Sequence, residues 1–285
     1  MLPAYITPQR IQQFIATALE EDVGEGDHST LAAVPDGTTS RARLLVKEGG
    51  LIAGITLAKE IFNYYSNALH VTFHCHDGDA VQAGDVAFIV EGPARAILTT
   101  ERLVLNSMQR MSGIATFTHK LAAHLVGTNT RLLDTRKTTP NFRMLEKWAV
   151  HIGGGQNHRF GLYDMVMLKD NHVDMAGGIA AAINRTKDYL RSRNKKLLIE
   201  IETRNLNEVE QVLQTGGVDI IMLDNMDVAD MQQAVKMIAG RYKTEASGSI
   251  TEANIKSIAA CGVDFVSVGA LTHSVKSLDL SLKVF

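Results

Sequence analysis

The hydrophobic and polar pattern of the chain changes near residue 131. Before that point, apolar residues first recur at helical spacing and then form short strand-like runs, which predicts a mixed α/β region. The turns Asp77–Asp79 and Ala83–Asp85 are typical of hairpins. The elements expected here are a helix over residues 8–21, strands over 42–46 and 86–90, and a helix over 100–125.

After residue 131 the pattern alternates between strands and helices. The strands are continuous apolar runs, which is typical of a parallel sheet that is covered on both faces. Such alternation predicts either a barrel or a doubly wound sheet. The expected strands are 131–133, 165–168, 197–201, 220–223, 243–246 and 265–268, and the expected helices between them are 177–190, 206–213, 229–238 and 252–259.

Polar side chains come directly after each of these strands. In a barrel the carboxyl ends of the strands share one rim, so residues that are far apart in sequence would meet there. A doubly wound sheet would spread them along an edge, and we therefore favour the barrel. The groups concerned are Asp134-Thr135-Arg136-Lys137, Lys169-Asp170-Asn171, Glu202, Asp224-Asn225, Ser247-Gly248-Ser249 and Gly269-Ala270.

Composition limits the kind of ligand. The chain has 285 residues, a net charge of -2 and a pI near 6.6, with no basic stripe that would bind nucleic acid. No apolar run approaches the roughly 20 residues that a membrane span needs. The first residues lack the pattern of a signal peptide, and Cys75 and Cys261 have no metal-ligand spacing, so we expect a cytoplasmic protein without a membrane partner.

Four basic residues, Arg136, Lys137, Arg159 and Lys169, are the strongest candidates for a binding site. Guanidinium groups grip carboxylates in a fork, and lysine offers a point charge to phosphate. A solvated loop is the ordinary explanation for a single basic residue. The position of these residues after predicted strands, beside the flexible Gly153–Gly155 turn, favours an anion pocket.

Acidic residues and glycine turns complete the candidate rim. Glu202 and Asp224 would bind Mg²⁺ through water or accept hydrogen bonds from sugar hydroxyls, or else form ion pairs with Arg136 or Lys169. The turns at 247–249 and 268–270 offer backbone N–H groups to a phosphate, and the first of them precedes a predicted helix. No nucleophile motif occurs, which suits a reaction limited by developing charge on a phosphorylated substrate.

Several long motifs resemble those of the quinolinate phosphoribosyltransferase family. The resemblance implies an N-terminal α/β sandwich over residues 1–115, an incomplete, seven-stranded α/β barrel over 116–271, and a C-terminal segment, 272–285, that returns to the first domain. The motifs are Glu21–Asp27, Glu101-Arg102, Ser112–Thr116, Asp134–Pro140, Gly153–Arg159, Leu168–His172, Leu223–Asn225 and Gly269–Ser274.

The resemblance also implies a reaction. Members of the family are pentosyltransferases that join quinolinate to 5-phosphoribosyl 1-pyrophosphate with Mg²⁺ and release pyrophosphate and CO₂. The product, nicotinate mononucleotide, serves the de novo synthesis of NAD. The family's active unit is at least a homodimer, and hexamers also occur.

Site residues carry over by motif. The implied quinolinate ligands are Arg102 from the partner subunit, Arg136, His158, Arg159 and Lys169. The implied catalytic residues are Lys137, Lys169, Glu202 and Asp224, the last two positioning Mg²⁺-pyrophosphate. The implied ligands of phosphoribosyl pyrophosphate are Thr135, Lys137, Lys169, Glu202, Asp224, Ser247, Gly248, Ser249, Val268, Gly269, Ala270 and His273. Ser249 departs from the asparagine that is frequent in the family, so a side-chain contact at this position does not carry over.

Two other functions fit parts of the sequence. A paralogue of the same fold, such as the proteins associated with molybdenum transport, would act on a different acid. A carrier or binding module is suggested by the turns within residues 77–85, although Lys47-Glu48-Gly49-Gly50 is not a carrier motif. Release of CO₂ that depends on quinolinate distinguishes the first alternative, and a mass spectrum without a lysine adduct removes the second.

Overall fold

The computed structural model describes residues 2–285, which form two compact units. Unit 1 comprises residues up to His119 together with Thr138–Gly154 and Leu271–Phe285. Unit 2 comprises Lys120–Lys137 and Gly155–Ala270. The C-terminal segment from Leu271 groups with unit 1, and so does Thr138–Gly154, which the expected boundaries placed in the barrel.

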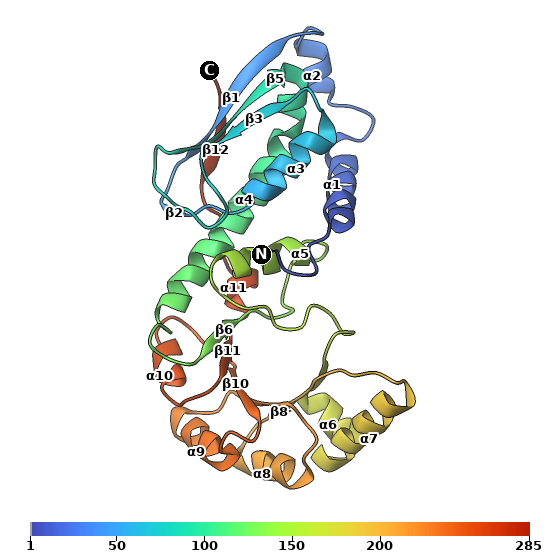
Figure 1. Ribbon diagram of the computed structural model, residues 1–285, viewed down its shortest axis with the longest axis vertical. Coiled ribbons are helices and arrows are strands. Elements are labelled where there is room, and N and C mark those ends of the chain that lie inside the picture. The colour runs from blue at the N-terminus through green and yellow to red at the C-terminus, as the bar shows by residue number, and fades with distance from the viewer. Residues whose placement is uncertain (1) are drawn as a thin grey trace. The chain divides into compact units, whose positions relative to one another are not determined.

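Unit 1 contains a four-stranded antiparallel sheet in the order β12-β1-β5-β3 (Figure 1). Strand β1 alternates, with Ala42, Leu44 and Val46 buried on one face, and Leu44 pairs with Leu282 on one side and Phe88 on the other. These residues form the core under the sheet. The strands are β1 (Thr39–Val46), β3 (His70–Phe73), β5 (Val86–Pro93) and β12 (Leu280–Val284).

The two glycine turns form where they were expected, but they do not make hairpins. The strand between them, β4 (Ala80–Val81), pairs with β2 (Gly50–Leu51) rather than with β3 or β5. The hairpin interpretation was wrong because β3 and β5 pair directly with each other, and the intervening residues form a separate two-stranded ladder.

The helices of the first half begin with α1, whose start follows from local sequence. Pro8 occupies the first turn, the Thr7 side chain accepts from the Arg10 amide at 3.3 Å, and Ile11 and Ile15 are buried along one face. The expected helices over 8–21 and 100–125 are therefore confirmed with shifted ends. The helices are α1 (Pro8–Val23), α2 (His28–Ala33), α3 (Ile55–Tyr65), α4 (Ala94–Ala123) and α5 (Arg143–Ile152).

Helix α5 belongs to unit 1 because buried charge and a close backbone approach join it to α4. Glu146 has no exposed surface and accepts hydrogen bonds from Arg110 through Nη2 at 2.8 Å and Nε at 3.1 Å. Gly153, which ends α5, lies so close to Ala115 and Thr118 that a Cβ atom has no room. The sequence pattern did not predict this helix or its attachment.

Unit 2 is an open parallel sheet in the order β6-β11-β10-β9-β8-β7, with helices in the crossover connections. The expected alternation of parallel strands and helices is confirmed. The sheet has six strands where the resemblance implies seven, and a single parallel bridge between Leu133 and Gln156 adds one further pairing beside β6. The strands are β6 (Arg131–Leu133), β7 (Val166–Leu168), β8 (Ile199–Thr203), β9 (Ile220–Asp224), β10 (Lys243–Ser247) and β11 (Phe265–Ser267).

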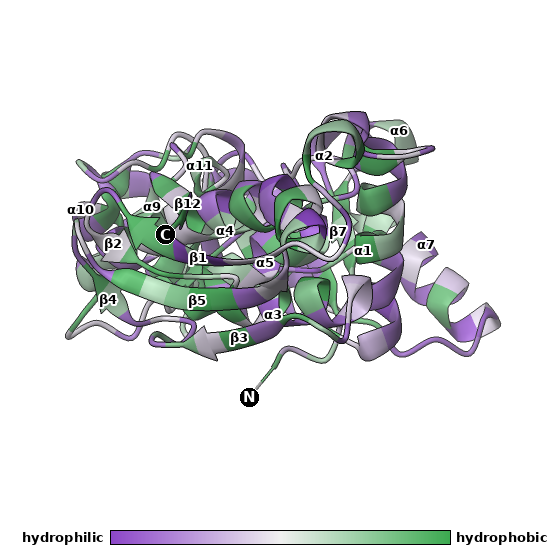
Figure 2. Cartoon of the chain, turned by 90° about the horizontal axis from the view of Figure 1, so that it is seen from above, coloured by the Kyte–Doolittle hydropathy of each residue, from purple (hydrophilic) through white to green (hydrophobic). Residues whose placement is uncertain are grey.

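The helices of unit 2 follow their strands and contact one another in chain order. Figure 2 shows that α7 carries both hydrophilic and hydrophobic residues, as expected for a helix with one buried face. Within the described residues, no helix is long and apolar enough to cross a membrane. The helices are α6 (Asp170–Ala176), α7 (Ile179–Ser192), α8 (Leu206–Thr215), α9 (Val228–Ile238), α10 (Ile255–Ala259) and α11 (Ala270–His273), whose last three residues belong to unit 1.

Candidate active site

The candidate site residues of unit 2 lie at or just beyond the carboxyl ends of its parallel strands. Ligand sites in open α/β sheets and barrels occur at this edge, because the loops that follow the strands share it. The parallel order of the strands therefore brings the segments that carry these residues to one edge of the sheet. The residues are Thr135, Arg136 and Lys137 after β6, Lys169 after β7, Glu202 in β8, Asp224 at the end of β9, Ser247, Gly248 and Ser249 at β10, and Val268, Gly269 and Ala270 after β11.

Two predicted site residues belong to unit 1. Arg102 lies on α4 with 66% of its side chain exposed, and its nearest carboxylate is that of Glu101 at 4.0 Å. His273 ends α11 and is exposed, with Nδ1 at 2.5 Å from the Ser274 hydroxyl. Arg102 thus presents a guanidinium at the surface of the chain, and its expected role across a dimer interface stays a prediction.

Asp134 anchors the loop that carries His158 and Arg159. Its carboxylate is fully buried and accepts hydrogen bonds from Asn157 Nδ2 at 2.7 Å and from the His158 amide at 2.9 Å. The loop also pairs with β6 through Gln156, whose amide donates to Leu132 O at 2.8 Å. The sequence showed Asp134 only as part of a motif, and the structure gives it this anchoring contact.

Arg159 is partly buried and lies near the guanidinium group of Arg136. Its guanidinium donates to the Met165 carbonyl at 3.2 Å and forms no ion pair with a carboxylate of the described residues. Burial lowers the pKa of Arg159, and the charge of nearby Arg136 lowers it further. Two guanidinium groups that repel each other are stabilised when an anion binds between them.

Lys169 and Glu202 form an ion pair at the site. Lys169 Nζ lies 3.1 Å from Glu202 Oε2, and about half of the lysine side chain is exposed while the glutamate is buried. The ion-pair interpretation of Glu202 is therefore confirmed with Lys169 as the partner. Asp224, on the neighbouring strand β9, is half-buried, and its Oδ2 accepts from Asn225 Nδ2 at 2.7 Å.

The backbone conformation of the turn after β10 requires glycine at position 248. Gly248 adopts φ +93°, and a Cβ atom there would overlap the Asn225 side chain, so only glycine fits. Ser249 also has a positive φ of +50°. The helix expected directly after this turn was placed too early: α10 begins at Ile255, because Thr251 and Asn254 first form a hydrogen-bonded turn at 2.7 Å.

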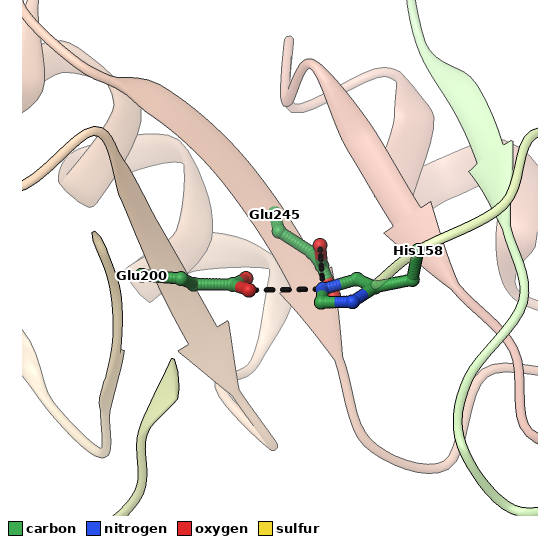
Figure 3. Close-up of side chains that lie close together, drawn as sticks. All are labelled: His158, Glu200 and Glu245. Carbon is green, nitrogen blue, oxygen red and sulfur yellow. Dashed lines mark hydrogen bonds and ion pairs between the residues drawn. The ribbon is translucent and has the colours of Figure 1, made fainter. Parts of the chain in front are cut away.

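A buried cluster of three ionisable side chains lies in unit 2, and the sequence predicted only one of the three as a site residue. His158 Nε2 is 2.9 Å from Glu200 Oε2 on β8 and 3.4 Å from Glu245 Oε2 on β10 (Figure 3). Both carboxylates are fully buried. Only His158 was a candidate. The missed signal is the presence of a carboxylate in the interior of each of two strands that the sequence pattern predicts to be buried.

The cluster has strongly shifted protonation equilibria. Burial lowers the pKa of His158, but the hydrogen bond to Glu200 and the negative charges of Glu245 and Glu200 outweigh burial and raise the pKa above its ordinary value. Burial, together with the charge of Glu245, raises the pKa of Glu200 to about 7 although His158 opposes the shift. Such shifts are frequent beside functional sites.

The fold and this edge define a class: α/β proteins that bind a small polyanion at the carboxyl ends of parallel strands. Two family models match, "Quinolinate phosphoribosyl transferase, N-terminal domain" over residues 27–112 and "Quinolinate phosphoribosyl transferase, C-terminal domain" over residues 114–283. The chain belongs to the quinolinate phosphoribosyltransferase family.

Known proteins agree with this assignment. The chain is 45% identical over 289 aligned residues, covering 96% of this chain and 82% of its relative, to a nicotinate-nucleotide pyrophosphorylase [carboxylating], chloroplastic, of Arabidopsis thaliana. It is 40% identical over 264 residues to a probable nicotinate-nucleotide pyrophosphorylase [carboxylating] of Bacillus subtilis, and the aligned region covers 93% of this chain and 90% of that relative. The crystal structure of NadC from Streptococcus pyogenes superposes with a TM-score of 0.92 at 39% identity, covering 98% of both chains.

Proposed function

We propose that this chain joins quinolinate to 5-phosphoribosyl 1-pyrophosphate and releases pyrophosphate and CO₂, giving nicotinate mononucleotide in NAD biosynthesis. Family membership across both domains carries this conclusion. The paired arginines and the Lys169–Glu202 ion pair at the carboxyl edge of unit 2 support it, because the two substrates together present carboxylate, phosphate and sugar groups.

Quinolinate is held by its two carboxylates. Arg136 and Arg159 supply guanidinium forks, and Lys169 adds a third positive charge beside them. His158 supports this site from behind, since Nε2 faces the buried carboxylates and Nδ1 faces the Arg159 amide. Arg102 of a partner subunit completes the pocket in a homodimer, and the cytoplasm is the proposed compartment.

Phosphoribosyl pyrophosphate occupies the rest of the edge. Glu202 and Asp224 accept hydrogen bonds from the ribose hydroxyls, while Thr135, Lys137 and Lys169 contact the pyrophosphate. The 5′-phosphate binds backbone N–H groups in two turns, and in the first of them the positive φ angles of Gly248 and Ser249 orient successive amides. The residues of these turns are Ser247, Gly248, Ser249, Val268, Gly269 and Ala270, with His273 as a further contact.

Magnesium fits the carboxylates of this edge. Glu202 and Asp224 lie near the ends of adjacent strands and offer oxygen donors, which Mg²⁺ prefers, and Mg²⁺ usually keeps several waters. These two residues would hold the ion through water, and the ion would supply charge neutralisation for the pyrophosphate.

The reaction follows from charge placement and needs no covalent nucleophile. As the bond from the ribose C1′ to pyrophosphate breaks, Lys137 and Lys169 stabilise the leaving anion, and the sugar carbon becomes positive. The pyridine nitrogen attacks that carbon with its own lone pair, so no general base removes a proton. The C2–carboxylate bond then breaks because the carbanion lies beside the cationic nitrogen, and the carbanion takes up one proton.

Comparison of two acids tests the proposal. The purified chain is supplied with phosphoribosyl pyrophosphate, Mg²⁺ and either quinolinate or nicotinate, and pyrophosphate is measured. We expect pyrophosphate release with quinolinate and a rate at least about 10²-fold lower with nicotinate, because a guanidinium fork is then left without its carboxylate. Equal rates, or consumption of a different acid only, would show that the chain is a paralogue with another substrate.

A further inference from the structure

The His158–Glu200–Glu245 cluster places charge where burial is costly. The His158 side chain is 6% exposed and both glutamates are fully buried. Removing an ion from water costs several kcal/mol unless partners compensate, yet Glu200 Oε1 and both Glu245 oxygens have no hydrogen-bond partner. A cluster with this cost requires a reason beyond the packing of the sheet.

Each glutamate of the cluster lies two positions before a residue that the resemblance assigns to substrate. Glu200 and Glu202 are two residues apart on β8, so their side chains leave the same face of the sheet. Glu245 and Ser247 have the same relation on β10. In each strand the deeper residue belongs to the cluster and the residue nearer the carboxyl end belongs to the proposed substrate site.

The geometry of His158 decides against a metal. The three side chains could offer donor atoms within 4.8 Å of one another. His158 Nδ1, however, accepts a hydrogen bond from the Arg159 amide at 2.7 Å, and only the neutral ring with its proton on Nε2 can make this contact, which therefore opposes the tendency of the two carboxylates to keep the ring charged. In this tautomer Nε2 has no lone pair for a cation, and it donates to Glu200.

The His158 ring instead links strands β8 and β10 to Arg159, a proposed ligand of the substrate. On one side, Nε2–H points between Glu200 and Glu245 (Figure 3). On the other side, Nδ1 receives the backbone N–H of Arg159. Asp134 fixes the preceding backbone through the His158 amide at 2.9 Å. The orientation of the ring therefore sets the backbone from which the Arg159 side chain leaves.

We propose that Glu200 and Glu245 are positioning residues, which hold the His158 ring so that Arg159 meets a carboxylate of the substrate. This inference rests on the proposed function, because it takes the substrate to be a pyridine dicarboxylate. Glu200 accepts the hydrogen bond that orients the ring. Glu245 adds a second negative charge on the same side, which keeps Nε2–H turned inward.

Truncation of Glu200 tests the role. In Glu200→Ala the ring loses its acceptor and Arg159 shifts, and a displacement of about 1 Å at a substrate ligand lowers kcat/KM for quinolinate by about 10–100-fold. The loss should appear in the KM for quinolinate, with the KM for phosphoribosyl pyrophosphate unchanged. Glu200→Gln keeps an oxygen that accepts from Nε2–H and should restore kcat/KM to within about threefold of the wild type. Glu210→Gln, an exposed change on α8, is the matched control.

A double-mutant cycle with Arg159→Met distinguishes positioning from loss of packing. If Glu200 acts through Arg159, Glu200→Ala should lower kcat/KM by less than about threefold in the Arg159→Met background. If the two substitutions instead lower kcat/KM by independent factors that multiply in the double mutant, the proposal is wrong. Should Glu200→Ala not fold, as judged by its thermal melting, the same cycle with His158→Asn gives the same decision.

Three outcomes separate the positioning role, the proposed function and a metal site from one another. A wild-type chain that releases no CO₂ from quinolinate overturns the proposed function. A wild-type chain that does so while Glu200→Ala keeps its quinolinate KM overturns only the positioning role. A rise in melting temperature on adding Zn²⁺ or Mn²⁺ alone, lost in Glu245→Gln, would contradict the geometry of Nε2 and establish a metal site.

Discussion

Replacing Arg159, a basic residue of the proposed quinolinate pocket whose contacts the structure describes, tests that pocket. In the structure this guanidinium donates to the Met165 carbonyl at 3.2 Å, forms no ion pair with the described carboxylates, and has a pKa that burial and Arg136 lower. Its unmet charge is therefore available to a ligand. Arg159→Met keeps much of the side-chain volume and removes the fork.

The expected magnitude follows from the bonds that would be lost. A hydrogen bond to a charged group contributes about 1.5–3 kcal/mol, and a fork makes two of them. Relief of the repulsion from Arg136 offsets part of this loss. We expect a net loss of about 3 kcal/mol, which is a factor of about 10² in kcat/KM for quinolinate. Arg159→Lys keeps the charge without the fork and should lose about tenfold.

The assay is the initial rate of CO₂ release with each substrate varied in turn. Arg185→Met, at an exposed position of α7, is the matched control and should behave like the wild type. The effect should fall on quinolinate and leave the KM for phosphoribosyl pyrophosphate within about twofold. If Arg159→Met keeps the wild-type kcat/KM for quinolinate, Arg159 does not bind that acid and the assignment of the pocket is wrong.

Three further predictions concern other parts of the chain. Glu146→Gln breaks the buried pair with Arg110 and should lower the free energy of unfolding by about 3 kcal/mol, and an unchanged denaturation midpoint in urea would contradict this. Gly248→Ala forces a side chain onto φ +93° and should raise the KM for phosphoribosyl pyrophosphate about tenfold while quinolinate binding, measured by calorimetry, stays constant. Hydrogen bonds from Thr30 hold the pKa of Asp27 below its ordinary value of 3.8, so its contribution is present above that value and is lost as the pH falls through the folded-state pKa. Asp27→Ala removes the N-cap of α2 and should therefore cost about 1 kcal/mol at pH 7, and its unfolding curve should converge with the wild type in acid; a constant difference at all pH values would refute the linkage.

The strands after residue 131 could be predicted to within two residues because they are short apolar runs bounded by polar loops. Helix α5 (Arg143–Ile152) could not, since buried Glu146 and Lys147 interrupt the apolar pattern that identifies a helix. Their burial depends on partners elsewhere in the chain, of which Arg110 is one. Local periodicity carries no information about such pairs.

The residues of the candidate site also divide into those that the sequence predicts and those that it does not. Residues at or just after the ends of strands, such as Asp224 and Lys169, could be predicted because parallel strands bring their carboxyl ends to one edge. Glu200 and Glu245 could not, because each lies within a strand and gains its meaning only from the other and from His158. The number of strands in unit 2 could not be predicted from the sequence either, because the extended segment at Gln156 pairs only through a single bridge to Leu133 of β6.

A product balance with quinolinate labelled in its C2 carboxyl group tests the proposed reaction most directly. We expect labelled CO₂, pyrophosphate and nicotinate mononucleotide to form in equal amounts, and only when phosphoribosyl pyrophosphate is present. Pyrophosphate formed without labelled CO₂, or no turnover of quinolinate by the folded chain, would contradict the proposed reaction.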